Sequence, residues 1–161
     1  MSTQSGRDLV ELELSGQRYA LPMEQVIELA PCVRSRPLPG APFVVEGMVN
    51  HGGAPIPLVS LRRVLGLPVR ETWNDHLIIV HTPTRIVALR VDRAVGLLTV
   101  DDAAITAAPP SRHVRGVVVL SDNDLLYIQD LDALLSLSEE AALSSAIAAA
   151  TEADVNTRAP A

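Results

Sequence analysis

Four histidines are the first side chains in this sequence that could take part in chemistry: His51, His76, His81 and His113. His76 and His81 flank one predicted strand five residues apart, and an odd separation places them on opposite faces of a regular strand. Two imidazoles on opposite faces cannot share one tetrahedral metal ion, so we interpret both as solvated and expect no metal site. His51 stands in a turn beside Gly52, where we expect it to be exposed and to act only as part of a partner surface.

Asp92 and Cys32 are the remaining candidates for catalysis. Asp92 follows the predicted strand 86–91, where an aspartate can cap a turn or, alternatively, act as a general base. The spacing places no nucleophile and no second acid near it. Cys32 follows Pro31 in a proline-rich loop without an activating neighbour, so we expect a half-buried structural thiol. Asp122 and Asp124 lack the spacing of a calcium loop.

The sequence contains none of the common catalytic or cofactor-binding motifs: G-x-S-x-G, H-E-x-x-H, paired C-x-x-C and G-x-G-x-x-G are absent. All 13 basic residues are arginine, which excludes a Walker A loop and Schiff-base chemistry. The net charge of -6 and the scarcity of aromatic residues (2%) argue against nucleic-acid binding. We therefore expect a protein that is not an enzyme and needs no cofactor. A small hydrolase using Asp92 and a histidine is the remote alternative.

Length and composition indicate one globular domain, since the chain has 161 residues, of which 48% are apolar and 20% charged. No apolar run approaches the roughly 18 residues of a membrane-spanning helix. Residues 1–8 are polar, so we expect a flexible tail rather than a signal peptide. The single cysteine cannot form an internal disulfide, which favours a reducing cytoplasm.

Hydrophobic periodicity predicts an all-β domain of many short strands. Val10, Leu12 and Leu14 alternate with Glu11 and Glu13, the pattern of a strand with one wet face. The predicted strands are 10–14, 18–21, 44–49, 56–61, 77–80, 86–91, 95–100, 114–120 and 125–128. Residues 50–53 are the clearest hairpin signal. Residues 23–29 could form a helical turn that runs into a strand, and short helical turns are predicted at 61–66 and 130–137.

The C-terminal end changes character. Ser138 could cap a helix whose first turn carries Glu139 and Glu140, and an alanine-rich run follows to residue 150. Leu143 and Ile147 give this helix a narrow apolar stripe. We predict a helix at 138–150 that covers its own barrel, with docking on a partner as the alternative, and a disordered tail at 151–161.

Five short stretches suggest a family by their order. They are Tyr-Ala-Leu-Pro at 19–22 with Val-Ile-Glu at 26–28, Pro-Leu-Pro-Gly-Ala-Pro at 37–42, Gly-Met-Val-Asn at 47–50 with Ile-Pro-Leu-Val-Ser-Leu-Arg at 56–62, Val-Asp at 91–92 with Val-Gly-Leu at 95–97, and Ile-Gln-Asp-Leu at 128–131 with Leu-Leu at 134–135. In combination they resemble the CheW-like domain of bacterial chemosensory arrays. The resemblance implies two intertwined five-stranded SH3-like barrels that share one hydrophobic core, over residues 9–137.

The resemblance also implies a function. Members of this family are cytoplasmic adaptors without catalytic activity that link the regulatory domain of a CheA-type histidine kinase to chemoreceptor tips at membrane-associated arrays. By similarity, Val26 and Glu28 fall where the family contacts the kinase. The hairpin falls in the region that contacts receptors. The predicted partner-binding set is completed by Gly47, Asn50, His51, Gly52, Gly53 and Arg62.

Two positions depart from the family pattern. Gly52 stands where the family usually has arginine, and Ser60 stands where it usually has aspartate. Arginine would offer a planar cation with five donors, whereas glycine offers only its backbone. An alternative function is therefore a divergent modulator, for example of a twitching or surface-sensing pathway, that binds the kinase but not receptors.

Overall fold

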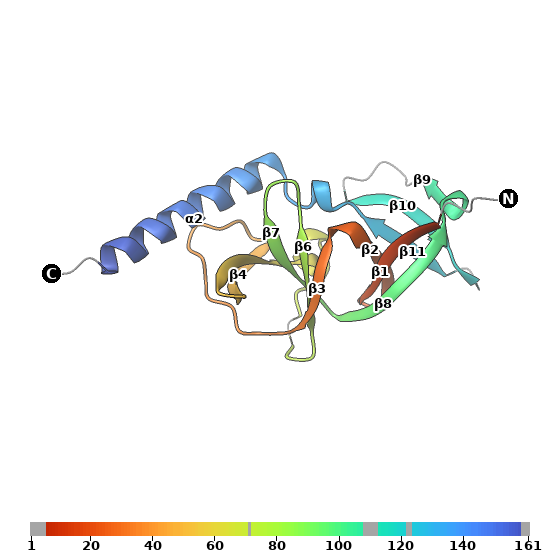
Figure 1. Cartoon of the computed structure of the whole chain (residues 1–161), viewed down its shortest axis with the longest axis horizontal. Coiled ribbons are helices and arrows are strands. Elements are labelled where there is room, and N and C mark those ends of the chain that lie inside the picture. Colours follow the sequence, from red (N-terminus) through yellow and green to blue (C-terminus); the bar gives the residue numbers. More distant parts are fainter. Residues whose placement is uncertain (1–5, 71, 108–112, 122–123, 159–161) are drawn as a thin grey trace.

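Two β-sheets make up most of this protein in the computed structural model, which describes residues 6–70, 72–107, 113–121 and 124–158 (Figure 1). The first sheet has six strands, in the order β8 (Arg93–Asp101), β1 (Gly6–Leu14), β2 (Gln17–Pro22), β11 (Leu125–Gln129), β10 (Val114–Val119) and β9 (Ile105–Ala107). The second has five, in the order β3 (Val26–Pro31), β6 (His76–His81), β7 (Ile86–Val91), β5 (Ala54–Ser60) and β4 (Val45–His51). The described helices are η1 (Met23–Gln25), α1 (Leu61–Val64), η2 (Asp102–Ala104), η4 (Leu131–Ala133) and α2 (Leu137–Arg158).

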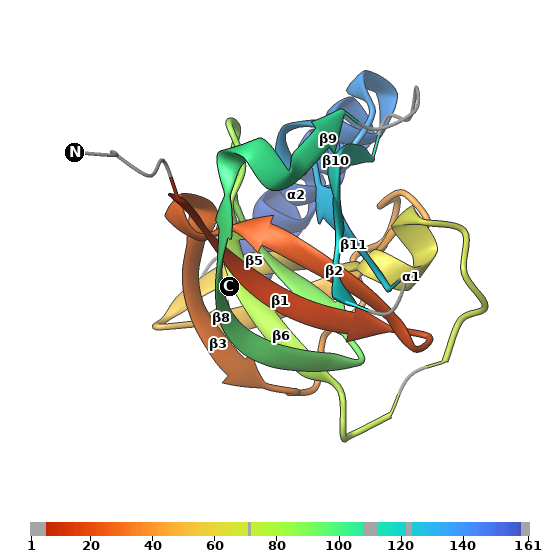
Figure 2. The same ribbon diagram turned by 90° about the vertical axis from the view of Figure 1, so that its right-hand side faces the viewer.

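The two sheets are intertwined because the first takes its strands from both ends of the chain. Strands β1 and β2 begin the chain, while its other strands, β8 to β11, follow the complete second sheet in sequence. Strand β11 joins β2 in parallel, with Tyr127 opposite Tyr19. Figure 2 shows β1 and β2 beside β11 although more than a hundred residues separate them in the sequence. The predicted pair of intertwined SH3-like barrels is confirmed, with the short β9 as a sixth strand of the first sheet.

The hydrophobic core has three parts. One cluster lies inside the first sheet and includes Leu9, Val118 and Leu126, and another lies inside the second and includes Leu58 and Ile79. The largest cluster draws on both sheets, on η4 and on α2. Because this third cluster is shared, neither sheet has a complete core without the other.

Strand β1 differs from the predicted pattern in two ways. It begins at Gly6, so residues 6–8 belong to a strand and not to the predicted tail; residues 1–5 lie outside the described part. Glu11, expected on a wet face, is only 6% exposed. The guanidinium of Arg18 donates to it through Nε at 2.6 Å and Nη2 at 2.9 Å. A buried carboxylate is tolerated there because a bidentate cation compensates it.

Helix α2 is longer than the predicted 138–150, since it begins at Leu137 and continues to Arg158. Its N-terminus is capped by Ser136 rather than Ser138: Ser136 Oγ accepts the Glu139 amide at 3.1 Å, and Glu139 Oε1 accepts the Ser136 amide at 2.8 Å. This reciprocal pair is a capping box. None of the described helices combines the length and the hydropathy of a membrane-spanning segment.

The first half of α2 packs on the barrels, as predicted. Leu143 and Ala146 are buried in the shared core, and Arg85 donates to Glu140 at 3.1 Å and to Ser144 at 2.8 Å. Residues 148–152 are exposed, and the helix extends beyond the sheets in Figure 1. Only the early turns of α2 therefore contribute to the core.

Candidate partner-binding surfaces

The β4–β5 hairpin presents a tip without a charged side chain. Its two loop residues, Gly52 and Gly53, have φ angles of 59° and 88°, the left-handed values of a type I′ hairpin turn. The Asn50 side chain stabilises the turn because its Oδ1 accepts the Gly53 amide at 2.9 Å. A Cβ at Gly52 would meet nothing within 4 Å, so the turn leaves room for a side chain but imposes a strained backbone on it.

Glu28 and His51, predicted to serve two different partners, contact each other. His51 Nε2 lies 2.5 Å from Glu28 Oε1. Glu28 belongs to β3 and His51 to β4, the two outer strands of the second sheet, so the contact forms only because the sheet curls into a barrel. Both side chains remain accessible, at 51% for Glu28 and 29% for His51. The two predicted surfaces therefore meet at one seam of the barrel.

Val26 and Gly47 have clear structural roles. Val26 is half-buried and packs against the shared core. Gly47 is buried, and a Cβ there would collide with the backbone carbonyl of Arg36. That close approach lets the loop pair with β4, because the Arg36 amide donates to the Met48 carbonyl at 2.8 Å and the Met48 amide donates back at 2.7 Å. Of these two predicted residues, Val26 is partly accessible, whereas Gly47 is buried and leaves room for the loop beside β4.

Arg62 lies inside the protein rather than on a partner surface. Its side chain is 7% exposed and donates two hydrogen bonds to the Asp92 carboxylate, through Nε at 2.7 Å and Nη2 at 2.5 Å. Its Nη1 donates to the Pro68 carbonyl at 2.9 Å. Asp92 also accepts the amide of Ser15 at 2.9 Å. These contacts join a turn of the first sheet to α1 and to the β7–β8 connection, so Arg62 stabilises the junction of the barrels.

The environment of Asp92 favours its ionised form. Partial burial alone would raise the pKa of this carboxyl group. The hydrogen bonds from Arg62 and Ser15, together with the positive charges of Arg62 and Arg70, outweigh burial and hold its pKa below the ordinary value. A carboxylate with a lowered pKa and three occupied hydrogen bonds is a poor general base, so the turn-capping interpretation of Asp92 agrees with the geometry.

The other candidate residues form no catalytic or metal constellation in the described part of the chain. His76 Nδ1 accepts the Ala94 amide at 2.8 Å, whereas His81 Nε2 lies 3.0 Å from the Glu24 carbonyl. No group of three or more potential ligands occurs among the described residues. Cys32 is half-buried as predicted, with Arg90 Nη1 at 3.3 Å from its sulfur. Asp122 lies outside the described residues.

An exposed apolar strip on β3 and β8 was not predicted as a site. Its members are Ile27 and Leu29 on β3, 44% and 48% exposed, and Val95 and Leu97 on β8, 43% and 74% exposed. A cavity of about 290 Å³ between the two strands is lined by Leu29, Pro31, His76 and Ala94. Alternation along 93–101 hinted at one exposed apolar face, but the sequence did not show that β3 lies beside it. An apolar strip of this kind is typical of a protein-binding surface.

Comparison with known proteins identifies the family. The CheW-like domain matches residues 8–139. The chemotaxis protein CheW of Rhizobium meliloti is 29% identical over 147 residues, which cover 87% of this chain and 94% of that protein. The chemotaxis protein CheW of Bacillus subtilis is 28% identical over 137 residues, which cover 81% and 88%.

A solved structure supports the same assignment at the level of the fold. The scaffolding protein TtCheW from Thermoanaerobacter tengcongensis matches with a TM-score of 0.75 and 24% identity, over 83% of this chain and 94% of that chain. The sequence match and the structural match each cover most of the chain, and the chain belongs to the CheW-like domain family.

Proposed function

We propose that this protein is a non-enzymatic adaptor that couples a CheA-type histidine kinase to the cytoplasmic tips of chemoreceptors. The observation that carries the proposal is the CheW-like domain match over residues 8–139. The relatives in Rhizobium meliloti and Bacillus subtilis bear the name chemotaxis protein CheW. An adaptor of this kind works in the cytoplasm at membrane-associated arrays.

The surface geometry supports two contact regions. Glu28 lies on an outer strand and keeps half of its side chain accessible, which suits a charged contact with the kinase regulatory domain. The strip of Ile27, Leu29, Val95 and Leu97 supplies the apolar area that a transient signalling interface buries. We assign the strip and the neighbouring hairpin to the receptor.

Such an adaptor transmits a signal without chemistry. It binds kinase and receptor together and contributes contact energy to whichever relative arrangement it fits better, so a change in the receptor alters the population of active kinase. Its contribution is limited to the difference in its binding free energy between the two arrangements.

Gly52 supports the second candidate, a modulator that binds the kinase but not receptors. The hairpin tip lacks a cation, and its neighbour His51 is held against Glu28. A receptor surface that expects arginine at this tip would lose a planar, multidentate donor. This candidate keeps the kinase contact at Glu28 and removes the receptor contact.

Reconstitution with the kinase and receptor fragments from the same organism tests both candidates. Binding to each partner is measured by sedimentation, and ATP turnover of the kinase is measured with and without receptor. We expect Glu28→Arg to weaken kinase binding by about tenfold, because one close charge contact is worth about 1.4 kcal/mol. The control is Glu152→Arg, an equal change of charge at an exposed position of α2.

The outcomes separate the candidates. An adaptor sediments with both partners and makes ATP turnover depend on the receptor, and Leu97→Asp reduces receptor binding alone. A modulator binds the kinase but does not sediment with receptors. Binding of neither partner overturns both, and equal effects of Glu28→Arg and the control overturn the assignment of Glu28.

A further inference from the structure

Arg34 and Arg36 carry positive charges that no carboxylate of the described chain neutralises. Both are exposed and neither has an ion-pair partner. Six other arginines each bind at least one carboxylate: Arg7, Arg18, Arg62, Arg85, Arg90 and Arg93. The chain has a net charge of -6, so these two unpaired cations, two residues apart, form a positively charged patch on a mainly negative protein.

The loop that carries these arginines is held in place by its backbone. The main chain of Arg36 is paired with Met48 of β4, which gives this part of the loop an extended, strand-like conformation. In an extended segment, residues two apart lie on the same side. Arg34 and Arg36 accordingly line one cavity of about 270 Å³ together with Met48, Asn50 and Pro55.

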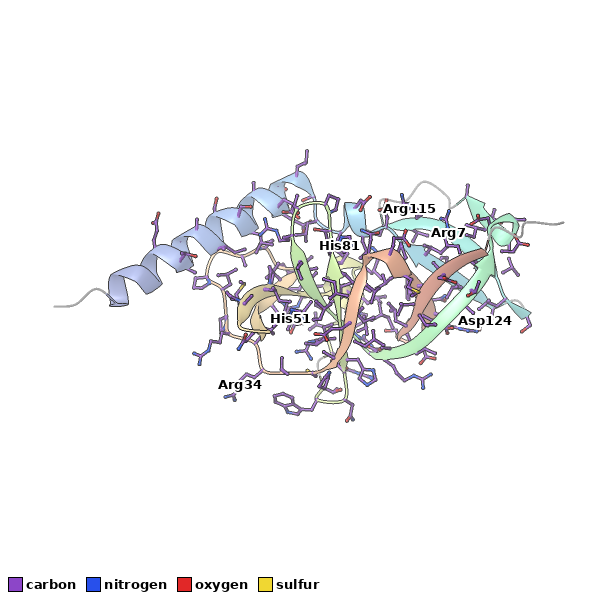
Figure 3. The ribbon with its side chains drawn as sticks, viewed as in Figure 1. Arg7, Arg34, His51, His81, Arg115 and Asp124 are labelled. Atoms are coloured by element: carbon purple, nitrogen blue, oxygen red, sulfur yellow. The ribbon has the colours of Figure 1, made fainter. Side chains whose placement is uncertain are left out.

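Apart from the two arginines, neutral and apolar groups line the 270 Å³ cavity. Asn50 uses its Oδ1 to accept the Gly53 amide, and its side-chain nitrogen has no partner among the described residues. Arg34 also lines a neighbouring cavity of about 310 Å³ with Trp73 and Val33, which are 73% and 41% exposed. Glu46 lines this cavity too, but its carboxylate is paired with Arg90 at 2.8 Å. Figure 3 shows Arg34 projecting away from the ribbon on the side of the protein that carries His51. The face therefore combines two guanidinium groups with apolar surface on both sides.

We propose that this face binds a short acidic segment of a partner protein. A carboxylate placed at Arg34 and Arg36 accepts charge-assisted, bidentate hydrogen bonds, and an adjacent apolar side chain packs on Trp73 or on Met48 and Pro55. Charge complementarity selects an acidic ligand. A protein segment fits better than a nucleic acid, because two cations match one or two carboxylates whereas a longer polyanion meets the negative remainder of the surface.

The face shares Asn50 with the hairpin that we assign to the receptor, but the proposal names no kinase or receptor and does not require the adaptor function. Its test uses the full-length protein and the blocked peptide Glu-Leu-Glu-Leu-Glu. Trp73 is the only tryptophan of the chain, so its fluorescence reports binding at this face, and amide chemical shifts locate the site. We expect a saturable change in fluorescence with a Kd of about 1 mM. The largest amide chemical-shift changes should fall on residues 33–36, 48–50 and 73.

Matched variants establish which charges act. Arg34→Glu with Arg36→Glu is expected to weaken peptide binding by at least about tenfold, and Arg34→Lys with Arg36→Lys to retain most of it. The control is Arg7→Glu with Arg115→Glu, an equal change of charge at two exposed arginines of the first sheet, on β1 and β10. Figure 3 shows Arg7 and Arg115 in the opposite half of the molecule from Arg34. The control is expected to leave binding within about twofold, because exposed charges beyond a Debye length are screened.

Four results would overturn the proposal. The first is a Trp73 fluorescence signal that shows no saturable change up to about 5 mM peptide, because a Kd of about 1 mM would give near-saturation there. The second is equal binding of the matched peptide Gln-Leu-Gln-Leu-Gln, which would leave the arginines without a role. The third is equal or tighter binding of inorganic phosphate or oligothymidylate, which would make the face a general anion or nucleic-acid site. The fourth is an equal loss in the Arg7/Arg115 control.

Discussion

Replacing Arg62 by methionine tests whether the contact with Asp92 holds the two barrels together. The change keeps an unbranched apolar side chain of similar length but removes the cation and its hydrogen bonds to Asp92 and Pro68. Removing one partner of a buried ion pair costs about 3–5 kcal/mol of unfolding free energy, because the other charge stays buried without compensation. Asp92 keeps 18% of its side chain exposed, so we expect the lower end, about 3 kcal/mol.

Arg93→Met is the matched control. Arg93 also binds a carboxylate, Glu13, at 3.0 Å, but their side chains are 58% and 35% exposed. An exposed pair of this kind is worth at most about 1 kcal/mol. Urea unfolding followed by far-ultraviolet circular dichroism measures both variants, with the midpoint compared at equal slope.

The pH dependence of the same comparison gives a second test. The pKa of Asp92 is lowered in the folded protein, so its stabilising contribution is present above the unfolded pKa of about 3.9 and is lost as the pH falls through the folded pKa. Without Arg62, burial acts unopposed and the pKa of Asp92 rises. The stability gap between the unsubstituted protein and Arg62→Met should therefore shrink as the pH is lowered from 7 toward 4. A cost no larger than that of Arg93→Met, or a gap that does not change with pH, would refute the reasoning.

Three further substitutions test the loop, the hairpin and the helix. Gly47→Ala should lower the free energy of unfolding in urea by about 1–3 kcal/mol and shift the amide resonances of residues 34–37. The reason is that the methyl group of the new alanine displaces the Arg36 carbonyl. Unchanged resonances would contradict the close approach. Gly52→Arg should lower the free energy of unfolding by about 1–2 kcal/mol, because residue 52 has a φ of 59°, a left-handed value that strains an arginine. The same variant should bind receptors more tightly. A rise in stability or no gain in receptor binding would count against the role of the hairpin tip. Leu143→Ala should lower the free energy of unfolding by about 2–5 kcal/mol because the leucine side chain is fully buried. Ala149→Ser, at an exposed position of the same helix, should change it by less than about 0.5 kcal/mol. Similar effects of both variants would show that α2 does not pack on the core.

Local patterns predicted most elements of this fold. The alternation of Val10, Leu12 and Leu14 marked β1, and the paired glycines at 52 and 53 marked the β4–β5 turn. Such patterns act over a few residues, because side-chain period and turn chemistry are properties of the local backbone. Local patterns placed Glu11 on a wet face and the helix cap at Ser138; contacts of Arg18 with Glu11 and of Ser136 with Glu139 decide otherwise.

The candidate site depended on contacts between distant residues. Nothing in the local sequence shows that Glu28 meets His51, 23 positions away, or that Asp92 accepts the Ser15 amide, 77 positions away. The prediction that Arg62 contacts a partner came from its place in a motif. Arg62 is buried because the fold places α1, the β7–β8 connection and the β1–β2 turn next to one another.

By itself, the sequence determined that this is an all-β domain without catalytic motifs, because residue types and their period set strand propensity and possible chemistry. Tertiary structure alone decided which charges remain free. Among the described residues, six arginines contact carboxylates when the sheets close, while Arg34 and Arg36 stay exposed on a loop whose backbone pairs with Met48 of β4. The physical reason is that ion pairing depends on distances of a few ångströms in space, which sheet closure sets and sequence spacing does not.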